Sequence, residues 1–141
     1  MEKIKIGFGE VEKIIKEFAH GNREFLEEID FVAGMSRGGL VPAALLAAKI
    51  DKPLVAAYIN KNDEIFFDRA EWIASKNILV VDDIIRSGKT LWFLQKHLQK
   101  HCHPQSISFF VLYRVKSLQD SDYDVLSIAR EIDEDVIFPW D

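Results

Sequence analysis

The chain has 141 residues, a formal net charge of −5, and 48% hydrophobic and 29% charged residues. This length supports one hydrophobic core, so we expect a single domain over residues 1–141. The acidic balance excludes the broad positive field of a nucleic-acid-binding protein. The apolar runs are far shorter than the roughly 20 residues of a membrane span, and residues 1–13 lack a secretory apolar segment. With one cysteine, Cys102, these features predict a cytoplasmic protein with no membrane or nucleic-acid partner.

The first fifty residues predict helices, then a strand, a tight loop and another helix. Apolar residues recur at helical spacing over residues 11–18, and a second short amphipathic piece follows at residues 25–29. Residues 30–35 (DFVAGM) are an apolar run typical of a short strand. The loop Ser-Arg-Gly-Gly at residues 36–39 separates that strand from a helix-like segment at residues 40–50.

The middle of the chain repeats this order. Residues 53–59 (PLVAAYI) predict a buried strand, and the polar residues 60–76 predict an excursion or a short hairpin. A strand is expected at residues 77–81 (NILVV), followed by a helix that begins near Ser87 and keeps an apolar period of 3.6. Residues 106–113 (SISFFVLY) have the composition of another strand.

Alternating strands and helices, with nearly continuous apolar strands, predict an α/β fold with a mostly parallel sheet and helices on both faces. The acidic tail at residues 121–141 has short apolar runs and is expected to add a small lobe at the sheet edge. Ligands in such folds bind beyond the carboxyl ends of the strands. The loops at residues 36–39 and 82–88 are both expected there.

Residues 80–90 (VVDDIIRSGKT) place two acids next to a segment typical of phosphate binding. A nucleoside-triphosphate P-loop is excluded, because that motif needs a glycine where Asp83 stands. Glycine and hydroxyl residues at a helix start expose N–H groups that hold a phosphate monoester, and Ser87 and Thr90 add donors. Carboxylates accept hydrogen bonds from vicinal ribose hydroxyls, so Asp82 and Asp83 upstream of this loop suit a ribose 5-phosphate.

The loop at residues 36–39 offers Arg37 as a fork-shaped cation and two glycines that let the backbone approach an anion. This combination suits a second phosphate group such as pyrophosphate, which brings Mg²⁺ with it. Each motif alone is also compatible with an ordinary helix start or turn. Their shared position at the ends of expected parallel strands favours one common crevice.

On these residues the sequence resembles the type I phosphoribosyltransferases. Residues 80–90 look like that family's motif for 5-phosphoribosyl-1-pyrophosphate (PRPP). Residues 32–47 (VAGMSRGGLVPAALLA) resemble the pyrophosphate loop and following helix of the small xanthine-guanine and hypoxanthine branch. The terminal VIFPWD, residues 136–141, is similar to tails in that branch. The resemblance covers most of residues 30–141 and implies the type I phosphoribosyltransferase fold, with a small hood formed partly by the C-terminal tail.

The resemblance implies transfer of the 5-phosphoribosyl group from PRPP to a nucleobase, with Mg²⁺ bound with PRPP, in a homo-oligomer of two or four subunits. It implies 6-oxopurine salvage with xanthine, guanine or hypoxanthine. Asp82 and Asp83 would hold Mg²⁺ and, with Arg86, form the catalytic set. Ser36–Arg37 also lies where some members of the family have a non-proline cis peptide. The substrate-contacting residues that the resemblance implies are Ser36, Arg37, Gly38, Gly39, Asp82, Asp83, Ile84, Ile85, Arg86, Ser87, Gly88, Lys89, Thr90, Lys116 and Val136.

Two residues depart from the family pattern at positions that would contact the base. Arg86 stands where 6-oxopurine members normally carry an aspartate assigned to the purine five-membered ring, and arginine cannot act as a base. Asp135 lies near the position where an aromatic residue often stacks on the purine. Three hypotheses follow: a working transferase that favours an already anionic base, a non-catalytic PRPP- or nucleotide-binding regulator, and an unrelated sugar-phosphate enzyme.

Two further groups of residues lie outside these motifs. His97 and His101 share a helix face and Cys102 and His103 follow, but a solvated helix end explains this cluster better than a zinc site does. Trp72 and the segment before it are compatible with a mobile hood over the crevice, and equally with edge packing or a subunit contact.

Overall fold

The computed structural model describes residues 3–116 and 127–141, and within them a six-stranded sheet has the strand order β4-β3-β2-β5-β6-β7. The strands of this sheet are β2 (Phe31–Met35), β3 (Leu54–Ile59), β4 (Ile65–Phe67), β5 (Asn77–Ile85), β6 (Ser106–Val115) and β7 (Ser127–Ile132). All neighbouring pairs are parallel except β3 and β4. The mostly parallel α/β fold is therefore confirmed.

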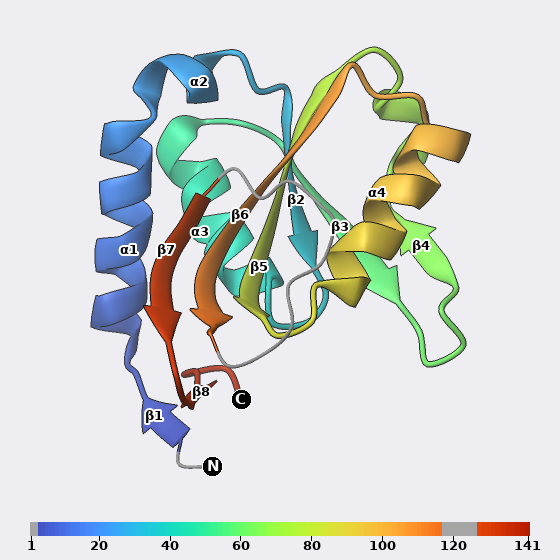
Figure 1. The fold of residues 1–141 in the computed structure, drawn as a ribbon. Coiled ribbons are helices and arrows are strands. Elements are labelled where there is room, and N and C mark those ends of the chain that lie inside the picture. Colours follow the sequence, from blue (N-terminus) through green and yellow to red (C-terminus); the bar gives the residue numbers. More distant parts are fainter. Residues whose placement is uncertain (1–2, 117–126) are drawn as a thin grey trace.

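Helices cover both faces of the sheet (Figure 1). They are α1 (Phe8–Gly21), α2 (Arg23–Glu27), α3 (Leu40–Ile50) and α4 (Lys89–His101), with a 3₁₀ turn η1 at Ala70–Trp72. Along β5, Leu79 and Val81 join the core under α1 and α3, whereas Ile78 and Val80 join the core under α4. Both sets are buried, because successive side chains of a strand point to opposite faces and each face is covered.

Two predicted boundaries differ from those observed. β5 continues to Ile85 instead of ending at Val81, because the longer β6 pairs with it as far as the Ile85–Arg114 position. Asp82 and Asp83 therefore lie in the last part of a strand and not in a loop. Helix α4 begins at Lys89, two residues after the predicted start, because Gly88 has a left-handed φ of 78° that no helix position takes.

The segment at residues 60–76 forms the predicted short hairpin, since β4 returns antiparallel to β3 with Tyr58 opposite Phe66. The tail does more than the sequence indicated. β7 is an edge strand of the main sheet, parallel to β6. β8 (Asp135–Ile137) pairs in parallel with β1 (Lys3–Lys5), forming a small two-stranded sheet beside the carboxyl ends of the central strands (Figure 1).

The residues that the structure describes include no helix both long and apolar enough to span a membrane. Residues 117–126, the first part of the predicted acidic tail among them, lie outside the described part of the chain.

Phe110 provides a test of the core under α1. Its ring is fully buried and stacks on Phe18, with centroids 3.7 Å apart and planes 6° apart. We expect Phe110→Ala to lower the free energy of unfolding by about 3–5 kcal/mol, because it leaves a cavity that the sheet cannot close. Urea unfolding measures this change. Phe66→Ala is the matched control: Phe66 is 55% exposed, so its loss should cost less than about 1 kcal/mol. Equal losses in both variants would contradict this description of the core.

Candidate functional site

The loop at residues 36–39 lies directly against the carboxyl end of β5. A Cβ atom on Gly38 would overlap the carboxylate of Asp83, and one on Gly39 would overlap the carbonyl oxygen of Val81. A hydrogen bond to the end of β2 stabilises the loop, since the Gly39 N–H donates to the carbonyl of Met35 at 2.7 Å. The two glycines are therefore needed for this close approach, and the two unusual sequence motifs meet at one edge of the sheet.

The peptide bond between Ser36 and Arg37 is cis, as the resemblance implies. The Ser36 N–H donates to the carbonyl of Ala57 on the neighbouring β3, at 2.7 Å. Helix α3 begins directly after this loop, at Leu40. The N-terminus of α3 thus lies at the same edge as the acids of β5, and the positive end of its dipole favours an anion.

Asp82 and Asp83 form the acidic part of the site. The backbone N–H of Asp83 donates to Asp82 Oδ1 at 2.8 Å. This hydrogen bond holds the Asp82 carboxylate against the backbone of Asp83. Burial, and then the charge of Asp83, raise the pKa of the Asp82 carboxyl well above its ordinary value. Two carboxylates this close repel each other unless a cation or a set of donors lies between them.

The two carboxylates of Asp82 and Asp83 are ligands that fit Mg²⁺. The ion is usually bound through one or two carboxylates together with substrate phosphates, and not by an all-protein cage. Asp82 and Asp83 provide that pair, and the described residues include no group of three or more His, Cys, Asp and Glu arranged around a metal. The same finding gives no support to a metal at His97 and His101, whose rings lie 4.8 Å apart.

The loop at residues 86–90 encloses a hollow of about 230 Å³. Gly88 takes the left-handed conformation that lets the chain turn into α4, and the Ser87 hydroxyl accepts from the Lys89 N–H at 3.3 Å. The residues that line this hollow are Asp82, Ile84, Ile85, Arg86, Ser87, Gly88, Lys89, Thr90 and Leu91. A concave loop with the hydroxyl groups of Ser87 and Thr90 at a helix start is the geometry that suits a phosphate monoester.

The C-terminal tail contacts both parts of this site. Arg86 donates to Asp135 Oδ1 at 2.6 Å, and the Trp140 indole donates from Nε1 to Asp83 Oδ2 at 3.2 Å. Trp140 also stacks on Phe138, with centroids 4.9 Å apart. Neither Phe138 nor Trp140 was among the expected site residues. A buried indole usually finds an acceptor for its N–H, but that signal could not identify Asp83 as the partner.

Arg86 and Asp135 are the two departures from the family pattern, and the structure places them in one ion pair. Partial burial raises the pKa of Asp135, but hydrogen bonds from the Val136 N–H and Arg86 outweigh it, so the net pKa is below its ordinary value. Asp135 is therefore a carboxylate at neutral pH. The Arg86 side chain remains 51% exposed.

The remaining expected site residues lie in different surroundings. Lys116 directly follows Val115, the last residue of β6, and its N–H donates to the carbonyl oxygen of Ile132 at 2.7 Å. Val136 is 4% exposed and belongs to the core, so only its backbone is available to a ligand. Ile84 and Ile85 pack against opposite cores and position the loop.

Trp72 lies away from these loops. Its ring packs at 6.1 Å from that of Phe31, and the Arg69 guanidinium lies 5.1 Å above it. This environment is that of edge packing, although the ring stays 48% exposed.

The family model of the phosphoribosyl transferase domain matches residues 2–141. A xanthine-guanine phosphoribosyltransferase of Idiomarina loihiensis is 29% identical over 125 residues, which cover 82% of this chain and 73% of that protein. A hypoxanthine-guanine phosphoribosyltransferase structure from Bacillus anthracis has a TM-score of 0.73 at 27% identity, covering 86% of this chain and 77% of the other.

The fold match extends further along the chain. A purine phosphoribosyltransferase structure from Pyrococcus horikoshii has a TM-score of 0.83 at 22% identity, covering 99% of this chain and 94% of the other. With a domain match over nearly the whole chain and the strand ends arranged as described, this protein belongs to the phosphoribosyl transferase family and is a phosphoribosyltransferase.

Proposed function

We propose that the protein transfers the 5-phosphoribosyl group from PRPP to a 6-oxopurine base and releases pyrophosphate. The observation that carries this proposal is the contact of Gly38 and Gly39 with the end of β5, because it brings two anion-binding loops to one pair of carboxylates. The relatives that act on xanthine, guanine and hypoxanthine support the purine as acceptor.

Each part of the site has a role in this reaction. The loop at residues 36–39 holds the pyrophosphate, with Arg37 supplying a bidentate cation. Residues 86–90 hold the 5-phosphate, and Asp82 and Asp83 accept from the ribose hydroxyls. Bound Mg²⁺, held by the same two acids, would neutralise charge on the leaving pyrophosphate.

Asp83 also has a role at the reacting carbon. As pyrophosphate leaves, positive charge develops at C1 of the ribose, and the nearby carboxylates stabilise it. The Trp140 indole keeps the Asp83 carboxylate oriented through its hydrogen bond. Orientation of this kind lowers the barrier because no reorganisation is needed during the reaction.

Arg86 sets the acceptor preference. A guanidinium cannot remove a proton from the base, so an acceptor that is already anionic is favoured, and xanthine suits this better than hypoxanthine. Asp135 takes one of the five N–H donors of Arg86 in the described structure. The others remain able to face an anionic base.

A non-catalytic PRPP- or nucleotide-binding regulator is the second candidate. The Arg86–Asp135 ion pair favours it, because both side chains are paired with each other at positions where base contacts would be expected. The family match leaves no support for an unrelated sugar-phosphate enzyme. From the resemblance we also propose a cytoplasmic homo-oligomer of two or four subunits, which light scattering after size exclusion would test.

Incubation with Mg²⁺, PRPP and single bases separates the two candidates. We expect nucleotide product from xanthine or another 6-oxopurine, read by mass spectrometry, and none from adenine, uracil or orotate. Binding of PRPP without product from any base would support the regulator instead. Absence of both binding and product would contradict the proposed site.

Asp83→Asn tests the acid pair. We expect kcat/KM to fall by about 10²–10³, because an amide cannot hold the cation or the developing charge in the same way. Asp63→Asn is the matched control: Asp63 lies on the β3–β4 loop with a left-handed φ of 59°, which asparagine tolerates. Steady-state kinetics with PRPP measure both. Equal effects of the two substitutions would count against the role of Asp83.

Arg86→Asp tests the acceptor preference. We expect activity on hypoxanthine to rise relative to xanthine, by up to about 10², because a carboxylate can interact with the N–H of a neutral base. The new acid would face Asp135, so Arg86→Asp combined with Asp135→Asn removes the repulsion and should show the same change. An unchanged ratio of the two bases in both proteins would refute the preference.

Trp140→Phe removes the indole N–H and keeps an aromatic ring on Phe138. Loss of one hydrogen bond to a charged acceptor should raise the KM for PRPP about tenfold and leave the unfolding midpoint nearly unchanged. Trp72→Phe is the control, since Trp72 contacts Phe31 and Arg69 and neither loop of the site. A lower midpoint with an unchanged KM would assign Trp140 to packing alone.

A further inference from the structure

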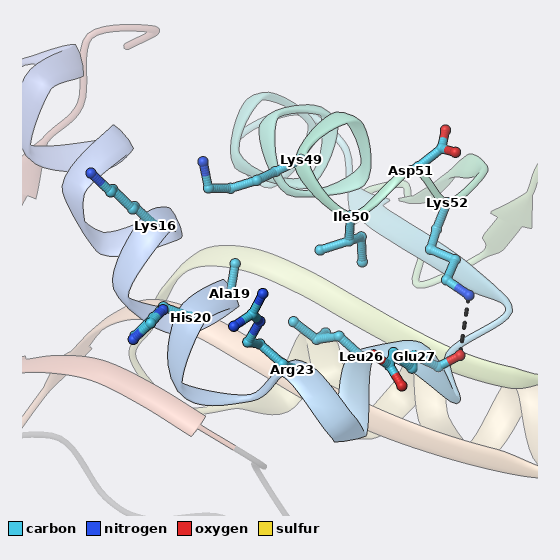
Figure 2. Close-up of a pocket in the computed structure, with 10 residues that line it drawn as sticks. All are labelled: Lys16, Ala19, His20, Arg23, Leu26, Glu27, Lys49, Ile50, Asp51 and Lys52. Carbon is cyan, nitrogen blue, oxygen red and sulfur yellow. Dashed lines mark hydrogen bonds between the residues drawn. The ribbon is translucent and has the colours of Figure 1, made fainter.

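The crevice is the candidate site formed by residues 36–39 and 82–90. A second concave site lies at the opposite end of the sheet from it. It is an open pocket of about 620 Å³ between the last turns of α1 and α3 and the short helix α2 (Figure 2). Figure 1 places α2 at the end of the molecule away from β8 and the C-terminus. We call this the basic pocket, and the residues that line it are Lys16, Ala19, His20, Arg23, Leu26, Glu27, Lys49, Ile50, Asp51 and Lys52.

The basic pocket has an apolar floor and a cationic rim. Leu26 is 3% exposed and, with Ala19 and Ile50, provides the apolar part of the lining. Figure 2 shows Arg23 and Lys49 projecting from facing elements, and the Asp51 carboxylate turned away from α2. An apolar floor with a few charged groups above it is the usual composition of a small-molecule site.

Most of the rim cations have no acidic partner. Among the residues that the structure describes, Lys16, Arg23 and Lys49 make no ion pair, and none of them donates a side-chain hydrogen bond. Lys52 donates from Nζ to the carbonyl oxygen of Glu27 at 3.2 Å. The lining thus has an excess of positive charge, although the net charge of the chain is −5.

The negative ends of two helix dipoles offset only part of the positive charge of the lining. Helices α1 and α3 end at Gly21 and Ile50, and each C-terminus carries the equivalent of about half a negative charge. The lining has four Lys and Arg residues against Glu27 and Asp51. After both carboxylates and both helix ends are counted, about one positive charge remains, and the two carboxylates are not paired with the rim cations.

We propose that the basic pocket binds a phosphorylated small molecule of nucleotide size. Its phosphates would contact Lys16, Arg23 and Lys49, and its organic part would lie on Leu26 and Ile50. The volume falls within the roughly 300–1,000 Å³ of small-molecule sites. A nucleic acid or a membrane would need a broad positive face, which an acidic chain with one local basic cavity does not present. The basic pocket is distinct from the crevice, so a ligand bound in it would not compete with PRPP.

ATP is a suitable probe, measured by isothermal titration calorimetry on the full chain. We expect one ATP per chain at the basic pocket, with Lys16→Gln and Lys49→Gln each weakening affinity about tenfold. Lys13→Gln and Lys100→Gln are matched controls. Lys13 is exposed on the same helix as Lys16, and Lys100 occupies the last turn of α4 as Lys49 does that of α3. Both controls should bind ATP as the natural chain does.

Lys89→Gln, in the loop of the crevice, separates the two sites. Unchanged ATP affinity in this variant, with weaker binding in Lys16→Gln and Lys49→Gln, supports the basic pocket. Weaker binding in Lys89→Gln alone would place ATP in the crevice and overturn the proposal. Equal weakening in pocket and control variants would show that only net charge matters and would overturn the proposal. Absence of ATP binding to the natural chain would overturn it too. Thermal unfolding of each variant confirms that it is folded.

Discussion

Gly38 and Gly39 pass so near the carboxyl end of β5 that neither position has room for a Cβ atom. This close approach follows from the sheet, because β2 and β5 are parallel neighbours with Gly34 opposite Val81. The loop that leaves β2 therefore runs at the level where Asp82 and Asp83 begin. Two segments that are distant in the sequence, residues 36–39 and 82–90, therefore share one edge of the sheet, and the rest of the candidate site is arranged around that contact.

The C-terminal tail completes the crevice through two polar contacts at different points. Asp135 pairs with Arg86 at one side, and Trp140 donates to Asp83 at the other. The two departures from the family pattern are therefore one physical feature, an ion pair between the loop at residues 86–90 and the tail. A change at either residue would leave the other charge without its partner, so the two positions are expected to act together.

The crevice and the basic pocket lie at opposite ends of the helices. At the crevice, α3 and α4 begin, so backbone N–H groups and the positive ends of their dipoles favour an anion directly. At the basic pocket α1 and α3 end, and the dipoles there have the unfavourable sign for an anion. An anion in the basic pocket would therefore depend on the side-chain charges of Lys16, Arg23 and Lys49.

The sequence alone determined the alternation of strands and helices, the parallel sheet with two covered faces, and the two loops at its carboxyl edge. These features depend on local periodicity and on glycines, which a single segment carries by itself. Only the tertiary structure decided that β5 extends through the acids, that β7 joins the sheet, and that β8 pairs with β1. Short strands have little local signal, since they form only where a partner strand offers hydrogen bonds. For the same reason the contacts of Trp140 with Asp83 and of Arg86 with Asp135, between residues far apart in the chain, could not be read from either segment alone.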